Sequence, residues 1–225
     1  MDTGAYRLVQ QRIAKLVTDA NADSVIPSCP DWRVRDLVAH LAGLCEDWVA
    51  GRLDGYASEA WTASQVARFS DLPVQAVLGR WEEALEPFAA LEDHPVMGPP
   101  ARWAFGDAVI HEADLRGTLK ADRVPADAVA LALRGSIGRW RQVLGEASAP
   151  TLLLRAPELR EWWLGVPDDP QATTVEAPAY EVFRALAGRR TEDQMRSWQW
   201  EGDPGPFLRA GLPYPFQWAS AQLTD

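Results

Sequence analysis

The chain has 225 residues, of which 47% are hydrophobic and 24% are charged. These are ordinary values for a globular protein and argue against a disordered chain. The net charge of −10 argues against a nucleic-acid partner, because nucleic-acid binding depends on basic patches that displace counterions. The acidity is interpreted as a feature that favours solubility.

The same composition bears on location. No stretch approaches the roughly 20 uninterrupted apolar residues that cross a bilayer. The N-terminal MDTGAYRLVQQR lacks both the basic start and the apolar run of a signal peptide. The two cysteines, Cys29 and Cys45, fit a reducing compartment better than a disulfide framework. We therefore expect a cytoplasmic protein with no membrane partner, either a monomer or a homodimer.

The first two-thirds of the chain carries helical periodicity. The clearest helix follows the turn VIPSCPDW, where Asp31 is the expected N-cap. Its apolar stripe has the i, i+3, i+4, i+7, i+11 spacing of one helix face, with a histidine in the middle. That stripe consists of Leu37, His40, Leu41, Leu44 and Trp48. Helices are predicted over residues 5–22, 32–52, 58–69, 73–91, 101–119 and 125–144.

After Gly145 the pattern changes to short apolar runs bounded by Pro, Gly and Asp. These runs predict strands over 151–155, 161–165 and 173–178, then a helix over 180–190 that ends at Gly188 and a loop-rich finish. Short helix connections favour antiparallel neighbours. The predicted fold is therefore mainly α: an up-and-down four-helix bundle over residues 1–147, followed by a small α/β domain over 148–225.

Two of the three histidines occupy positions that suggest a metal site. His40 lies inside an apolar helical stripe, and His111 follows Asp107 by four residues. Residues at i and i+4 project from the same helix face with Cβ atoms about 6 Å apart, so Asp107 and His111 could share an ion. With His40 from a facing helix, two imidazoles and one carboxylate leave a coordination position open, as in catalytic sites.

Spacing alone leaves other interpretations open. A histidine on an apolar face is often a hydrogen-bonded core residue, and Asp107 could simply neutralise a protonated His111. Asp114 lies at i+3 from His111 and could orient that imidazole as an outer partner. Cys29 and Cys45 are expected to be structural.

Three motifs carry a family resemblance. IPSCPDWRVRDLVAHLAGL resembles the opening motif of the mycothiol-dependent maleylpyruvate isomerase family, within the DinB/YfiT-like group of metalloenzymes. GDAVIHEADLRGTL is similar to that family's second motif, and FRALAGRRTEDQMRSWQWEGDP to a C-terminal signature of one subgroup. The resemblance spans residues 5–216 with the motifs in the family's order.

The resemblance implies a DinB-like four-helix bundle followed by a small α/β domain, with metal ligands that fall on His40, Asp107 and His111. One departure from the family pattern is Asp107, where better-known members carry glutamate. The shorter aspartate side chain is expected to change the metal preference or the metal affinity. Zinc is the first expected metal, with iron or nickel as alternatives, because two histidines and a carboxylate also suit ferrous iron.

The resemblance also implies mycothiol as cofactor or co-substrate and a small-molecule substrate. In the isomerase reaction the thiolate adds to a cis-enone, the new single bond rotates, and the thiolate leaves to give the trans product; related enzymes transfer the thiol to an electrophile. Arg189 and Arg190 are candidates for a bidentate clamp on an anionic group, or for capping a helix and pairing with Glu192 or Asp193.

Two other functions stay open from sequence. One is a metal-dependent hydrolase, in which a water activated by the metal replaces the thiol as nucleophile. The other is a protein of a different class, which binds a metal or a small molecule without turnover.

Overall fold

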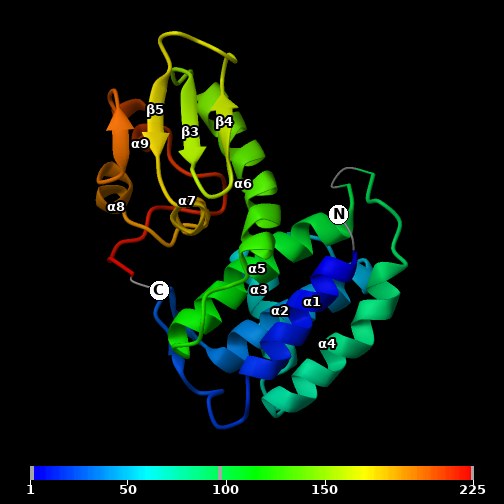
Figure 1. The fold of residues 1–225 in the computed structure, drawn as a ribbon. Coiled ribbons are helices and arrows are strands. Elements are labelled where there is room, and N and C mark those ends of the chain that lie inside the picture. The colour runs from blue at the N-terminus through cyan, green and yellow to red at the C-terminus, as the bar shows by residue number, and fades with distance from the viewer. Residues whose placement is uncertain (1–2, 96–97, 224–225) are drawn as a thin grey trace. The chain divides into compact units, whose positions relative to one another are not determined.

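The computed structural model describes residues 3–95 and 98–223. The chain divides between Val124 and Pro125 into two compact units, which are described separately. Helices dominate, and one small four-stranded sheet lies in the second unit (Figure 1). The mainly α fold class with a small α/β part is therefore confirmed. None of the helices in the described ranges is long and apolar enough to cross a membrane.

The first unit is a bundle of α1 (Thr3–Leu16), α2 (Val34–Ala50), α4 (Val74–Ala89) and α5 (Pro100–Thr118), with α3 (Glu59–Arg68) packed against α2. Helix α2 contacts both α4 and α5, and α1 contacts the same two helices (Figure 1). The apolar faces of these helices fill the space between them. Fully buried core side chains include Ile13, Leu37, Trp81 and Phe105.

Two local predictions in this unit are wrong. Helix α1 ends at Leu16 rather than at residue 22, because the Asn21 amide donates to the Leu16 carbonyl (2.9 Å) and so takes the place of a further helical turn. Asp31 is not the N-cap of α2, because it lies in strand β2 (Cys29–Arg33), which pairs with β1 (Val25–Ile26). The helix begins instead after Arg33, whose backbone N–H donates to the Asp36 carboxylate (2.8 Å).

The second unit is built on a sheet of order β4-β3-β5-β6. Strand β3 (Leu152–Ala156) pairs antiparallel with β4 (Arg160–Leu164) and parallel with β5 (Thr173–Glu176). Strand β6 (Gln199–Glu201) completes the sheet antiparallel to β5. Helix α7 (Ala179–Leu186) ends just before Gly188, whose φ of 73° is the left-handed conformation that favours glycine.

Helix α6 (Ala126–Glu146) contacts α7 and α9 (Gly205–Ala210) and so belongs to the second unit. The sequence places α6 in the first domain, with the boundary at 147/148, and that boundary stays a prediction. The C-terminal segment 204–216, predicted to be rich in loops, contains the short helix α9. Helix α8 (Glu192–Arg196) and strand β6 lie before that segment and were not predicted.

Candidate metal centre

His40 lies in the middle of α2 with only 5% of its surface exposed. The apolar residues of the same stripe hold it there: Leu37, Leu41 and Leu44 are all buried. Periodicity therefore fixes the direction of this side chain, which points into the bundle. A buried imidazole needs partners for both ring nitrogens, and the partners of His40 come from α3 and α5.

Asp107 and His111 reach the same point from α5. Nε2 of His40 lies 3.0 Å from Oδ2 of Asp107, and Nε2 of His111 lies 3.7 Å from Oδ1 of the same carboxylate. The two imidazole centroids are 5.4 Å apart with edge-on geometry. We call these three residues the His–Asp–His cluster. The structure thus brings together the three side chains that sequence singles out.

The cluster fits a divalent metal. One ligand atom from each residue lies within 4.8 Å of the other two. Ligands at about 2.0–2.2 Å from a tetrahedral zinc ion would lie about 3.3 Å from one another, so only small side-chain movements are needed. Both imidazoles are buried, whereas 30% of the Asp107 side chain is exposed. Three protein ligands with one accessible side match the open coordination of catalytic sites.

The far nitrogen of each imidazole has its own acceptor. Nδ1 of His111 lies 3.0 Å from Oδ2 of Asp114, and Nδ1 of His40 lies 2.8 Å from Oε1 of Gln65. An Nδ1–H that donates outward leaves Nε2 for a metal, and such partners orient ligating histidines in metalloproteins. Asp114 occupies the outer position predicted for it; its role stays a prediction.

The pKa of His40 is raised. Burial alone would lower it, but the Asp107 carboxylate opposes burial through its charge and its hydrogen bond, and Gln65 and Asp47 add smaller contributions. Protonated His40 therefore persists to a higher pH than an ordinary histidine. Because a metal and a proton compete for the same nitrogen, metal binding should weaken as the pH falls.

Trp32 covers the cluster on one side. Its ring centroid lies 5.2 Å from that of His40 and 5.9 Å from that of His111. An aromatic wall of this kind restricts water and gives a small ligand an apolar surface to contact. Cys29, on the same strand β2, has its sulfur within 4.8 Å of ligand atoms of His111 and Asp114.

Cys45 follows His40 on α2 by five residues, about 140° around the helix axis, and among the described residues its sulfur belongs to neither group of neighbouring metal-ligating atoms. It is fully buried, and burial raises the pKa of its thiol to about 12, so it stays a protonated core residue.

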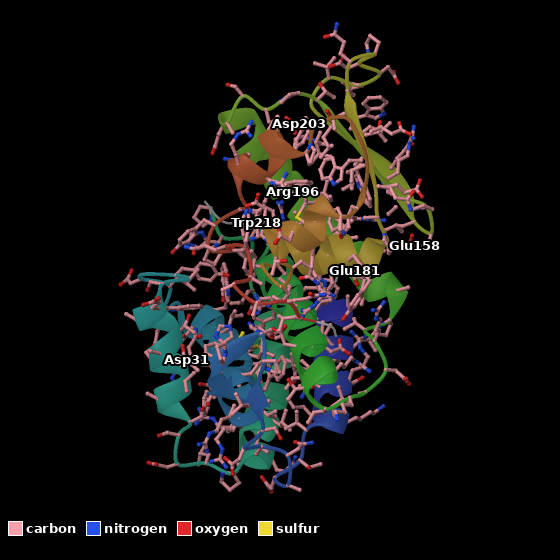
Figure 2. The ribbon with its side chains drawn as sticks, turned by 90° about the vertical axis from the view of Figure 1, so that its left-hand side faces the viewer. Asp31, Glu158, Glu181, Arg196, Asp203 and Trp218 are labelled. Carbon is pink, nitrogen blue, oxygen red and sulfur yellow. The ribbon has the colours of Figure 1, made fainter. Side chains whose placement is uncertain are left out.

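The candidate clamp residues follow α7 in the second unit. Arg190 donates two hydrogen bonds to the Glu181 carboxylate, from Nε (2.6 Å) and from Nη2 (3.2 Å), and its Nη1 donates to the Arg189 carbonyl. Arg189 donates from Nη1 to the Ala187 carbonyl at 2.7 Å. Figure 2 labels Glu181, the carboxylate that occupies the Arg190 fork. Of the sequence alternatives, pairing with an acid therefore describes Arg190, although the acid is Glu181 rather than Glu192 or Asp193.

Sequence reasoning missed two buried polar residues, Gln65 and Asp47. Gln65 is fully buried and Asp47 is 1% exposed. A weak signal exists for Asp47, because it follows His40 by seven residues, close to two helical turns, and so shares its face. Gln65 has a similar signal: it follows Trp61 by four residues on the buried face of α3.

Comparison with known proteins supports the family resemblance. Residues 7–116 match the family model for the mycothiol maleylpyruvate isomerase N-terminal domain, a segment that includes the whole cluster. Two similar solved structures are a mycothiol-dependent maleylpyruvate isomerase, at 17% identity, and a variant of it with one histidine changed to alanine, at 16%. Each covers 96% of this chain and 95% of its own, with a TM-score of 0.59.

At these identities the solved structures show that the fold is shared. No curated protein matches the chain. The family match confirms the resemblance over residues 7–116, which include the first sequence motif and most of the second.

Proposed function

We propose, on the premise that the N-terminal part of this chain belongs to the mycothiol maleylpyruvate isomerase N-terminal domain family, that the protein is a metal-dependent enzyme that uses mycothiol. Its reaction would be isomerisation of the maleylpyruvate type or transfer of the thiol to an electrophile. The observation that carries the proposal is the convergence of two imidazole Nε2 atoms on the Asp107 carboxylate, with both Nδ1 atoms facing acceptors.

In this proposal, different residues of the chain bind the metal, orient its ligands and exclude water. His40, Asp107 and His111 would hold the ion, and the buried partners of the imidazoles would keep the rings aligned. A bound divalent ion favours thiolate over thiol and so supplies a nucleophile at neutral pH. Trp32 would shield that sulfur from water on one side. Zinc is the proposed metal, and iron and nickel suit the same donor set.

The proposal is tested with the purified protein loaded with zinc. We expect loss of the cis-enone absorbance of maleylpyruvate only when mycothiol is present, or, for a transferase, consumption of mycothiol with an electrophilic co-substrate. Removing the metal with a chelator should abolish either reaction, and zinc should restore it.

Other outcomes would contradict the proposal. Turnover that needs the metal but not the thiol would indicate a hydrolase. A protein that binds metal but neither binds mycothiol nor turns over a substrate would be a non-catalytic binding protein. Absence of bound metal from the purified and zinc-supplemented protein would contradict both metal-dependent enzymes and leave only a protein that binds a small molecule without turnover.

We propose Arg189 or Arg190 as the ligand for an anionic group of the substrate or the thiol. Arg190 pairs with Glu181 through its guanidinium, so a change of Arg190 would also remove an ion pair of the second unit. The effect on substrate binding is therefore tested first at Arg189. Charge-assisted hydrogen bonds contribute about 1.5–3 kcal/mol, so Arg189→Ala should raise KM roughly tenfold or more and leave the metal content unchanged. Steady-state kinetics and elemental analysis measure the two effects.

Arg196→Ala is the control, because it removes an exposed charge from the same unit (Arg196 is labelled in Figure 2). Arg196 pairs with Glu192 at 2.6 Å. We expect wild-type kinetics from it. If Arg189→Ala, Arg190→Ala and the double variant all keep the wild-type KM, the anion clamp is wrong.

A further inference from the structure

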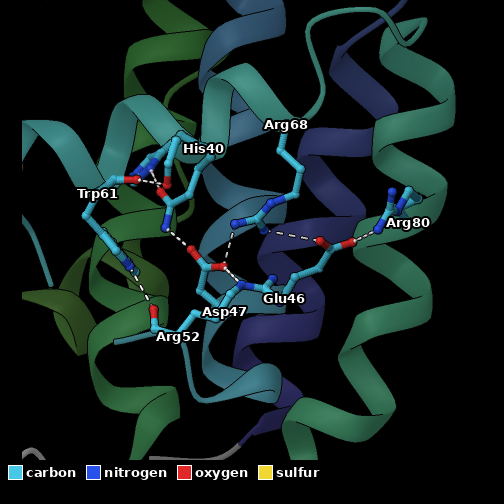
Figure 3. A network of polar contacts seen from close by, with 9 residues as sticks. His40, Glu46, Asp47, Arg52, Trp61, Arg68 and Arg80 are labelled. Carbon is cyan, nitrogen blue, oxygen red and sulfur yellow. Dashed lines mark hydrogen bonds and ion pairs between the residues drawn. The ribbon is translucent and has the colours of Figure 1, made fainter. Parts of the chain in front are cut away.

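A continuous chain of hydrogen bonds leads from His40 of the metal centre through α3 to Asp47, one turn from the end of α2 (Figure 3). It starts at Nδ1 of His40, which faces Oε1 of Gln65 at 2.8 Å. The amide nitrogen of Gln65 donates to Oδ2 of Asp47 at 2.8 Å. The other carboxylate oxygen of Asp47 accepts from Nε of Arg52 (2.7 Å) and Nη2 of Arg68 (2.6 Å).

The middle of this chain is closed to solvent. Gln65 is fully buried, and the Asp47 side chain is 1% exposed. A buried amide must satisfy its donor and its acceptor within the protein, because an unmade hydrogen bond there costs the desolvation of the group. Gly43 on α2 makes room for it: a Cβ at position 43 would lie 2.6 Å from Cβ of Gln65. The close contact at Gly43 therefore fixes the position of the Gln65 side chain, and its two hydrogen bonds fix the orientation of its amide.

The direction of each hydrogen bond is set from the Asp47 end. All three partners of Asp47 donate N–H groups: Arg52, Arg68 and the Gln65 amide. A carboxylate that accepts from the Gln65 nitrogen leaves the Gln65 oxygen directed at His40. That oxygen can only accept, so Nδ1 of His40 must be the donor. Nε2, on the opposite edge of the ring, is then the nitrogen presented to Asp107 and to a metal.

We propose that Asp47 and Gln65 are positioning residues that orient His40 for metal binding, with Asp47 acting through the amide of Gln65. The inference rests on the proposed function, because it assigns these residues to the same metal centre. The two ligand imidazoles are thus supported differently: His111 faces the Asp114 carboxylate directly, whereas His40 faces an amide whose orientation a carboxylate sets.

Ion pairs extend the chain beyond Asp47. Arg68 bridges Asp47 and Glu46, and Arg80 contacts the other oxygen of Glu46 at 2.6 Å (Figure 3). The side chain of Arg80 is 48% exposed, so solvent screens that last pair. The orienting effect should therefore depend on Asp47 and Gln65 and be insensitive to Arg80.

The sharpest variant is Asp47→Asn. Both arginines contact Oδ1, so that oxygen stays with them and the new amide nitrogen takes the place of Oδ2. The Gln65 amide must then turn over to accept from it, and its own nitrogen comes to face Nδ1 of His40. Two donors now oppose each other there. Gln65→Met removes the amide altogether while keeping a side chain of similar length.

Two readouts test the inference. Zinc affinity, measured by competition with a chromophoric chelator, should weaken roughly tenfold to a hundredfold in Asp47→Asn and in Gln65→Met, which is typical for the loss of an outer partner of a ligand histidine. In the metal-free protein at a pH where both ring nitrogens are protonated, the proton NMR signal of the His40 Nδ1–H should move upfield and exchange faster with water. Arg80→Gln is the matched control and should change neither.

Wild-type zinc affinity and an unchanged Nδ1–H signal in both folded variants, as judged by circular dichroism, would overturn the inference. The NMR readout needs no metal, so it separates this inference from the proposed function. If the wild-type protein does not bind zinc, the proposed function fails, while the shift of the Nδ1–H signal still decides whether Asp47 orients the Gln65 amide.

Discussion

Replacing His40 with alanine should remove most of the bound metal and leave the helical bundle folded. The metal loss should exceed the roughly tenfold to hundredfold change expected for an outer partner, because one of three protein ligands disappears. The fold should persist because the apolar stripe of α2 stays buried. Elemental analysis of the purified variant measures the metal, and far-UV circular dichroism measures the helix content.

His94→Ala is the control for this experiment, because it removes the third histidine from a position outside the cluster. It should keep the wild-type metal content. Near-stoichiometric metal in His40→Ala would show that His40 is only a core residue whose partners are Gln65 and Asp107.

Replacing each of the three carboxylates around His111 should change metal binding to a different extent. We expect Asp107→Asn to lose most of the metal, Asp114→Asn to weaken binding roughly tenfold to a hundredfold, and Glu112→Gln to leave binding unchanged. Asp107 is the acid within reach of both Nε2 atoms, at 3.0 Å from His40 and 3.7 Å from His111. Asp114 lies on the Nδ1 side of His111, where it can orient the ring but not share its metal.

Glu112 is the internal control because it is as buried as Asp114 but faces away from the metal centre. Its carboxylate accepts from Arg12 of α1 at 2.6 Å and from Arg116 at 2.9 Å. Breaking one partner of a buried ion pair is destabilising, so Glu112→Gln should lower the free energy of unfolding while its metal content stays that of the wild type. Metal titrations of all three variants make the comparison.

An opposite order would overturn the ligand assignment. If Asp114→Asn empties the site while Asp107→Asn retains metal, then Asp114 is the ligand, and the cluster of Cys29, His111 and Asp114 becomes the better candidate for the metal.

Much of the helical architecture could be predicted because helix formation leaves a local signature. The apolar stripe of α2 repeats with the period of one helix face, and the structure places the helix at Val34–Ala50, within two residues of the predicted 32–52. The spacing of Asp107 and His111 is equally local: four residues along one helix bring two side chains together in whatever context the helix is packed.

Helix ends and short elements were less predictable. The end of α1 depends on the single amide of Asn21. The start of α8 does carry a local signal in the sequence: Thr191 and Gln194 form a reciprocal capping box, with hydrogen bonds of 3.1 Å and 3.0 Å.

Periodicity along the sequence predicts which side chains point inward from each helix, and so which residues could be metal ligands. Which of these side chains meet depends on how the helices pack against one another. His40 and Asp107 are 67 residues apart, and Gln65 reaches His40 from a third helix. The physical reason is that periodicity specifies the buried face of one helix but not the rotation and register of its neighbours, which follow from how side chains of different helices pack. Helix α3 packs closely against α2 at Gly43, and this contact places the Gln65 amide between Asp47 and His40.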